Sequence, residues 1–190
     1  MKKGIPFLLI LAALFVGCNN EASDSVDKAD SANEANANNQ TTPGADQASA
    51  DFLVKAADGG MAEVETGQLA QEKASNSKVK AFASMMVNDH TNANSQVKSL
   101  AAARNVTLPT MVSDEHKQKK DELSKKSGAD FDKAYMDLMV DDHQKTINLF
   151  ENASGDVKDS EVKTFADNTL PKLRMHLDSA RAIRSGLDKR

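Results

Sequence analysis

Two histidines lie in nearly identical sequence motifs, at positions where a helix could carry them into a protein core. The segment MMVNDHTNA, residues 85–93, places His90 after two methionines and an aspartate, and LMVDDHQKT, residues 138–146, repeats that arrangement around His143. Each histidine continues a series of apolar residues spaced by three or four, which is the pattern of a buried helix face. The repetition indicates one shared role for the two imidazoles.

The same spacing adds two more inward polar residues. Glu63 lies in a series of small and apolar side chains between residues 52 and 74, and His176 lies in another between 162 and 187. A lone inward histidine is usually a satisfied core residue, but four unpaired polar groups in one core would each cost several kcal/mol. They could instead coordinate one zinc, copper or iron ion, or form a closed hydrogen-bond network. The predicted metal ligands are Glu63, His90, His143 and His176.

Sulfur could add to such a site. Met86 and Met139 each precede a histidine by one helical turn, and Met175 directly precedes His176. Thioether sulfur favours Cu(I), although methionines at helical spacing also fill gaps in apolar cores, and the sequence leaves both interpretations open. A ferritin-type di-iron site is disfavoured, because none of the three histidines lies in a Glu-x-x-His motif.

Catalytic motifs are missing from the sequence. It contains no Gly-rich phosphate loop and no G-x-S-x-G segment, and its only cysteine is Cys18, close to the N-terminus. Glu63 also has no second core carboxylate with which to form an acid and base pair. We predict no catalytic residues and do not expect an enzyme.

The first residues are typical of a secretory signal. Lys2 and Lys3 precede an apolar run over residues 5–16, which is too short to cross a bilayer, since a spanning helix needs about 20 residues. Phe15-Val16-Gly17-Cys18 resembles a bacterial lipobox, so we predict a signal peptide over 1–17 and lipidation of Cys18. Asn19, which is not Asp, favours the outer membrane, facing the periplasm or the cell surface. A cleaved and soluble secreted protein is the alternative.

Residues 18–50 are predicted to form a lipidated flexible linker. Val26 is the only aliphatic side chain larger than alanine after Cys18 in this stretch, so little apolar surface can offset the entropy of ordering. The segment carries six acidic side chains and one basic one, whereas residues 51–190 carry 22 acidic and 21 basic side chains. A nearly neutral domain does not favour a nucleic-acid partner, which would need a basic face.

Residues 51–190 are predicted to form one all-α domain, because apolar residues recur there at helical spacing and no segment alternates like a strand. Gly128 is expected to end a helix, and Pro171 is expected to bend one. The expected N-caps are Ser77, Ser113, Asp130 and Ser160. The expected helices cover residues 49–75, 77–104, 113–126, 130–153 and 160–187.

Depth along these helices decides which polar residues can meet. Glu63 and His90 lie at equal depth, each roughly 20 Å from the turn that joins the first two long helices. If the last turn lies near Gly155, His143 and His176 differ in depth on the order of 12 Å. The sequence therefore predicts one level pair and leaves the level of His176 open.

The domain also contains an internal repeat, since NSKVKAFA at 76–83 returns as DSEVKTFA at 159–166. Two helical hairpins joined by a segment over 105–129, with a short helix in the crossover, predict a ferritin-like four-helix bundle. Residues 52–182 resemble the bacterial family of domain of unknown function 4142, a ferritin-like and envelope-associated group. The resemblance rests on Ala62-Glu63-Val64, Leu69-Ala70, Phe82 to His90, Leu108-Pro109, Phe131-Asp132 with Tyr135, His143, Leu170-Pro171 and His176.

Two functions of different class remain. The first is a lipid-anchored envelope protein that binds, buffers or carries a transition metal through the Glu and His cluster. The second is a metal-free helical module for envelope structure or protein contact, whose inward polar groups bond to one another. The resemblance implies the inward positions of the four residues and names no ion, and the sequence names no protein partner.

Overall fold

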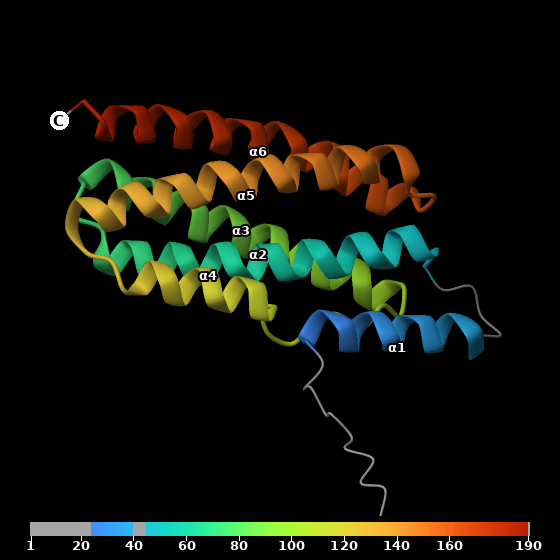
Figure 1. Ribbon diagram of the computed structural model, residues 1–190. Helices are drawn as coiled ribbons and strands as arrows, with labels where there is room; N and C mark the ends of the chain where they lie inside the picture. Colours follow the sequence, from blue (N-terminus) through green and yellow to red (C-terminus); the bar gives the residue numbers. More distant parts are fainter. Residues whose placement is uncertain (1–23, 40–44, 190) are drawn as a thin grey trace, which may run out of the picture.

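The computed structural model describes residues 24–39 and 45–189, and every regular element in them is a helix (Figure 1). This confirms the predicted all-α class. The helices are α1 (Ser25–Asn39), α2 (Gln47–Lys73), α3 (Ser77–Ala103), α4 (Asp114–Ser124), α5 (Gly128–Asp156) and α6 (Ser160–Leu187).

Four long helices lie side by side as two hairpins, α2 with α3 and α5 with α6 (Figure 1). The hairpins meet where α2 packs on α5 and α3 packs on α6. The connection from α3 to α5 runs back along the body and contains α4, which contacts both α2 and α5. This order lets all four long helices turn one face toward a common interior.

The helix boundaries follow local hydrogen bonding. Asn76 and Asp159 cap α3 and α6, each one residue before the predicted serine, while Ser113 caps α4 as predicted. The prediction for Gly128 is wrong, because this glycine begins α5 with φ 56° and does not end a helix. Asp130 is consequently not a cap, because it lies inside the first turn of α5.

The apolar core consists of two clusters separated by a polar layer. Towards the α5–α6 turn, Phe52 packs edge-on against Phe150 with ring centroids 4.9 Å apart. Towards the α2–α3 turn, Phe82 packs against Tyr135 with centroids 6.3 Å apart. The buried side chains of Glu63, His90, His143 and His176 lie on the same helices between these clusters.

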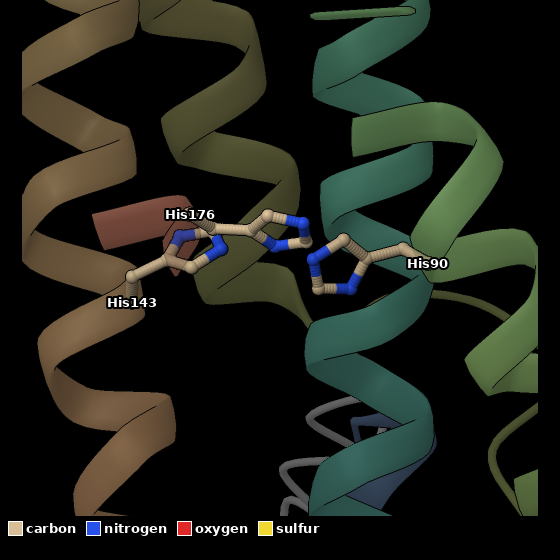
Figure 2. Close-up of side chains that lie close together, drawn as sticks. All are labelled: His90, His143 and His176. Carbon is tan, nitrogen blue, oxygen red and sulfur yellow. The ribbon is translucent and has the colours of Figure 1, made fainter. Parts of the chain in front are cut away.

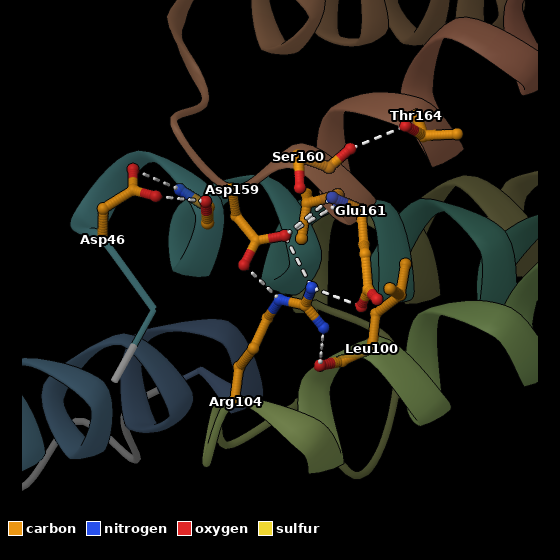
Figure 3. A network of polar contacts seen from close by, with 9 residues as sticks. Asp46, Leu100, Arg104, Asp159, Ser160, Glu161 and Thr164 are labelled. Atoms are coloured by element: carbon orange, nitrogen blue, oxygen red, sulfur yellow. Dashed lines mark hydrogen bonds and ion pairs between the residues drawn. The ribbon is translucent and has the colours of Figure 1, made fainter. Parts of the chain in front are cut away.

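Each hairpin turn is fastened by a residue of the other hairpin. Asp132 on α5 accepts hydrogen bonds from the backbone N–H groups of Ser75 and Asn76, both at 2.9 Å, and from the Ser75 hydroxyl. At the opposite end, Arg104 after α3 donates from Nε to Asp159 at 2.8 Å and from Nη2 to Glu161 at 2.8 Å (Figure 3). These contacts fix the register of the two hairpins.

Residues 25–39 and 47–50, which lie within the linker predicted over 18–50, are helical. Asn33 of α1 is buried, donates to the Thr107 carbonyl at 2.9 Å and accepts from the Thr107 N–H at 2.7 Å. An alanine-rich helix needs few apolar side chains when one amide pairs with a neighbouring backbone in this way. The predicted signal peptide over 1–17 and Cys18 lie outside the described residues.

None of the helices in residues 24–39 and 45–189 is long and apolar enough to cross a membrane.

Candidate metal centre

Three of the four predicted ligands meet near the middle of the long helices. The rings of His90, His143 and His176 turn toward one another from α3, α5 and α6, with centroids 5.4 to 5.7 Å apart (Figure 2). All three side chains are buried, and His143 and His176 are each only 1% exposed. One nitrogen from each ring lies within 4.8 Å of the corresponding nitrogens of the other two.

The end of α5 explains why His143 and His176 are level. The helix continues through Gly155 to Asp156, so the turn lies several residues later than the sequence indicated. The later turn lengthens the path from His143 and shortens the path to His176, which removes most of the expected difference in depth. Pro171 lies inside an uninterrupted α6, where it does not end the helix.

The His143 ring is oriented by its own helix. Its Nδ1 lies 2.9 Å from the backbone carbonyl oxygen of Met139, which can only accept a hydrogen bond. Nδ1 therefore carries the proton and donates it to Met139, and Nε2 is left with a lone pair. That Nε2 is buried and has no hydrogen-bond partner among the residues that the structure describes.

The His176 ring is oriented by a carboxylate on another helix. Its Nε2 lies 2.9 Å from Asp89 Oδ2, and Lys172 donates to Asp89 Oδ1 at 2.9 Å. An ionised Asp89 accepts from Nε2–H, which places the lone pair of His176 on Nδ1. Nδ1 of His176 and Nε2 of His90 are also buried without a partner in the protein.

Three unpaired imidazole nitrogens thus share one buried space. The closed hydrogen-bond network considered from the sequence does not form between these rings, because these nitrogens accept no hydrogen bond from a protein donor. A buried nitrogen without a partner costs free energy that a bound ligand can recover.

Burial keeps the three imidazoles neutral at physiological pH. It is the largest cause that lowers the pKa of His90 to about 3 and that of His143 to about 4, and the neighbouring histidines add to both shifts. The pKa of His176 is also lowered by burial, against the opposing hydrogen bond to Asp89. Neutral imidazole is the form that binds metal ions, so protons do not compete for this site at pH 7.

Glu63 lies beside the histidines and is not part of their three-nitrogen group. Its Oε1 is 3.5 Å from His143 Nδ1, the nitrogen that donates to Met139, and its Oε2 is buried without a partner in the protein. Burial, followed by the charge of Asp142, raises the pKa of Glu63 well above its usual value. Of the four predicted ligands, the structure therefore brings the three histidines together and places the carboxylate next to one of them.

The match to a known family covers most of the chain. The sequence pattern of the family described as Domain of unknown function (DUF4142) matches residues 32–183. The chain belongs to the DUF4142 family. This confirms the resemblance found from the sequence motifs. No curated protein matches the chain.

Two solved structures share the fold of this DUF4142 chain. The DUF305 fragment from Deinococcus radiodurans is 14% identical, with a TM-score of 0.67 over 75% of this chain and 99% of that one. A DUF305 protein from Streptomyces coelicolor is 12% identical, with a TM-score of 0.60 over 74% of this chain and 94% of that one.

Methionine sulfur divides between the core and the surface in this DUF4142 chain. Met86 and Met139 are fully buried in the apolar cluster that contains Phe82 and Tyr135, where they act as packing side chains. Met175 is 45% exposed, so the sulfur next to His176 in sequence lies at the surface. The three imidazoles are the donors that are seen to meet at this site.

The spacing of the nitrogens is wider than a bound ion requires. Tetrahedral zinc, with Zn–N distances of about 2.0–2.1 Å, holds two ligand nitrogens about 3.3 Å apart. The nitrogens of the three rings of the DUF4142 site lie within 4.8 Å of one another, so ion binding would require the rings to move closer together. Asp89, the neighbour of His90 in sequence, points about 100° away from it on α3 and reaches His176 on α6.

Proposed function

We propose that this protein binds one transition-metal ion through His90, His143 and His176. The observation that carries the proposal is that three buried imidazoles meet, with one nitrogen of each within 4.8 Å of the others, and that each ring has a buried nitrogen without a partner among the described residues. Three neutral nitrogen ligands without a thiolate suit zinc, copper or ferrous iron, and they leave a fourth coordination position open. Binding would serve to buffer or carry the ion.

The surrounding residues prepare the site for an ion. The Met139 carbonyl and the Asp89 carboxylate hold the protonated nitrogens of His143 and His176, so that both lone pairs stay on the inner side. Partners of this kind fix the orientation of a ligand imidazole and increase its basicity. The three ligands come from three helices whose register is fixed at both turns, which limits how far the rings can separate.

Metal titration of protein prepared without a histidine tag tests the proposal. Wild-type protein should take up about one Zn²⁺ or copper ion per chain, and saturation should raise the melting temperature because the ion binds only the folded state. His90→Ala, His143→Ala and His176→Ala should each weaken binding by at least about tenfold, an expectation set by the loss of one of three ligands. His116→Ala is the matched control, because His116 lies on α4 beside Asp58 and outside the group.

One result would replace this function by the alternative from the sequence. If the three core variants lose stability while wild-type protein takes up no zinc, copper or iron, the histidines serve the fold alone. The protein is then a metal-free module for envelope structure or protein contact.

We also propose that the four long helices form a ferritin-like bundle without ferritin chemistry. Two antiparallel hairpins and a long connection that returns along the body support this interpretation. The carboxylate-rich ligand set of di-iron ferritin sites is missing around the three histidines, so ferroxidase activity is not expected.

The proposed location is the bacterial envelope, with the chain held to the outer membrane through lipid on Cys18. Support comes from the lysines, the short apolar run and the Phe15-Val16-Gly17-Cys18 segment. Cys18→Ala should leave the membrane fraction or accumulate as uncleaved precursor, as measured by fractionation and intact mass. Normal processing with unchanged membrane association in this variant would contradict the anchor.

A further inference from the structure

Two cavities with shared lining residues lie between the surface and His90. An outer cleft of about 350 Å³ lies between α2, α4 and α5, and its lining includes Asp58, Lys119 and Asp142. An inner cavity of about 40 Å³ lies among the four long helices and reaches His90 and Asn94. Five residues line both cavities and so mark the place where they meet: Lys55, Gly59, Glu63, Thr146 and Leu149.

We infer that the outer cleft is the passage through which a metal cation reaches the histidines, and that Glu63 passes the ion from the cleft to His90. The inference rests on the proposed function and adds a route to it. Glu63 lines both cavities, and its Oε2 is buried without a partner in the protein. A cation that leaves water needs ligands in place of its hydration shell, and the Glu63 carboxyl group at the junction offers oxygen ligands.

The outer end of the passage also contains groups suited to a cation. Asp58 lines the cleft, and Asp142 lies at its wall, where it accepts from Lys119 of α4 at 3.1 Å. Lys119 also pairs with Glu115 of its own helix at 2.8 Å. Its contact with Asp142 of α5 holds α4 against α5 across the cleft. An arriving cation can displace this ammonium group from Asp142 and then meet Glu63 further inside.

Asp89 offers no equivalent route. It is hydrogen-bonded to Nε2 of His176, which is the protonated nitrogen, and it is paired with Lys172. An ion arriving there would face the side of the His176 ring that carries no lone pair. The cleft leads instead through the inner cavity to His90, whose unpaired Nε2 is one of the three donors.

Gly59 keeps the junction open. A Cβ atom at this position would meet no heavy atom within 4 Å, although the residue lies inside α2 and lines both cavities. At Gly60, in contrast, a Cβ would lie 1.9 Å from Asn94 Oδ1. A larger side chain at Gly59 should therefore fill the passage, and leucine suits a helix better than glycine does.

Stopped-flow exchange of Zn²⁺ with a coloured zinc chelator, using the tag-free chain, tests the passage. Gly59→Leu should slow both zinc uptake and zinc release by about tenfold, because a plug raises the barrier between two unchanged end states. The equilibrium Kd should stay within about twofold for the same reason. Gly155→Leu is the matched control, since Gly155 is an exposed helical glycine that lines neither cavity.

Glu63→Gln tests the transfer step separately. It should slow zinc uptake while changing the Kd less than His90→Ala does. Zinc binding by wild-type protein with wild-type rates in both Gly59→Leu and Glu63→Gln would overturn the passage alone. Absence of zinc uptake by wild-type protein would overturn the proposed function and the passage with it.

Discussion

Asp132 and Glu63 are both buried carboxylates of the same helical body, and their surroundings are opposite. Asp132 accepts three hydrogen bonds from the α2–α3 turn, so both of its oxygens are paired. Glu63 leaves Oε2 without a partner in the protein and lies next to three histidines that also have unpaired nitrogens. Desolvation costs are offset at the turn and remain uncompensated at the polar layer, and such uncompensated groups indicate a site for a ligand.

Arg104 extends the contrast to the basic side chains. Its guanidinium bonds to Asp159, to Glu161 and to the Leu100 carbonyl, and it closes the end of one hairpin against the other. Lys172, in contrast, is linked to the polar layer through one carboxylate, because Asp89 accepts hydrogen bonds from both Lys172 and His176. The ends of the molecule are thus built for stability, while its middle gives up stability to keep donor atoms available.

The largest expected effect is the response of the metal-free protein to pH. His90 and His143 have pKa values lowered to about 3 and about 4, so both stay neutral in the folded state while the unfolded chain takes up protons. The stability that these neutral groups contribute is complete above the histidine pKa of the unfolded chain, about 6.5, and is lost as the pH falls toward 4. Each histidine should contribute a loss of about 1.4 kcal/mol per pH unit in this window.

Urea unfolding between pH 6.5 and 5 measures this loss before ordinary carboxylates begin to titrate. His143→Ala should reduce the slope by one histidine's share, whereas His116→Ala serves as the comparison outside the polar layer. If His143→Ala and wild-type protein show the same change of unfolding free energy with pH, the account of the polar layer is contradicted.

Asp132→Asn should cost about 3 kcal/mol of unfolding free energy. The substitution replaces one acceptor oxygen by an NH2 group that faces the turn's N–H donors, and bonds to a charged acceptor are each worth about 1.5–3 kcal/mol. Chemical denaturation at pH 7 gives the value. Asp130→Asn, at an exposed position in the same turn of α5, is the control. A cost below about 1 kcal/mol, the net value of one neutral hydrogen bond, would mean that the paired carboxylate does not stabilise the turn.

Arg104→Ala should cost about 2 kcal/mol, somewhat less than Asp132→Asn, because one of its partners, Glu161, has a side chain that is 73% exposed. Arg174→Ala provides the comparison, since Arg174 and Glu151 form a single exposed pair worth at most about 1 kcal/mol. Thermal unfolding of both variants measures the difference. Equal losses in the two variants would place the Arg104 contacts among ordinary surface pairs.

Glu63→Gln should have the smallest effect and the opposite sign, a gain on the order of 1 kcal/mol in the metal-free protein at pH 7.5. Burial raises the folded-state pKa of Glu63, so the unfolded chain carries a charge that the folded protein disfavours. That penalty appears above the unfolded pKa and grows as pH rises, and the neutral amide does not experience it. The gain over wild type should therefore shrink when both proteins are unfolded at pH 5, and a loss of stability at pH 7.5 would contradict this reading of Glu63.

The long helices and their inward faces could be predicted from the sequence, because apolar residues at intervals of three and four specify which face is buried. His90 and His143 were placed correctly by that pattern alone. Helix α1 was missed, because Ala29 and Asn33 dock it by close packing and one amide pair, and neither leaves an apolar stripe. The level of His176 stayed open in the sequence because Gly155, which usually weakens helices, lies inside α5 and moves the turn.

Contacts between side chains on neighbouring helices could not be predicted from the sequence either. The contact between Asp89 and His176 depends on how α3 and α6 are rotated about their axes, which no local pattern records. The position of Glu63 behind His143, instead of among the three donor nitrogens, depends on the same rotation.

The two fastened turns lie at opposite ends of the body, and the histidines lie between them (Figure 1). Because both ends are fixed, the two hairpins can neither slide along one another nor separate from one end. If the proposed ion binds between the two ends, it has to enter and leave through the side of the bundle, by local motion of α4 and a few side chains. The four long helices would then keep their arrangement while the ion exchanges.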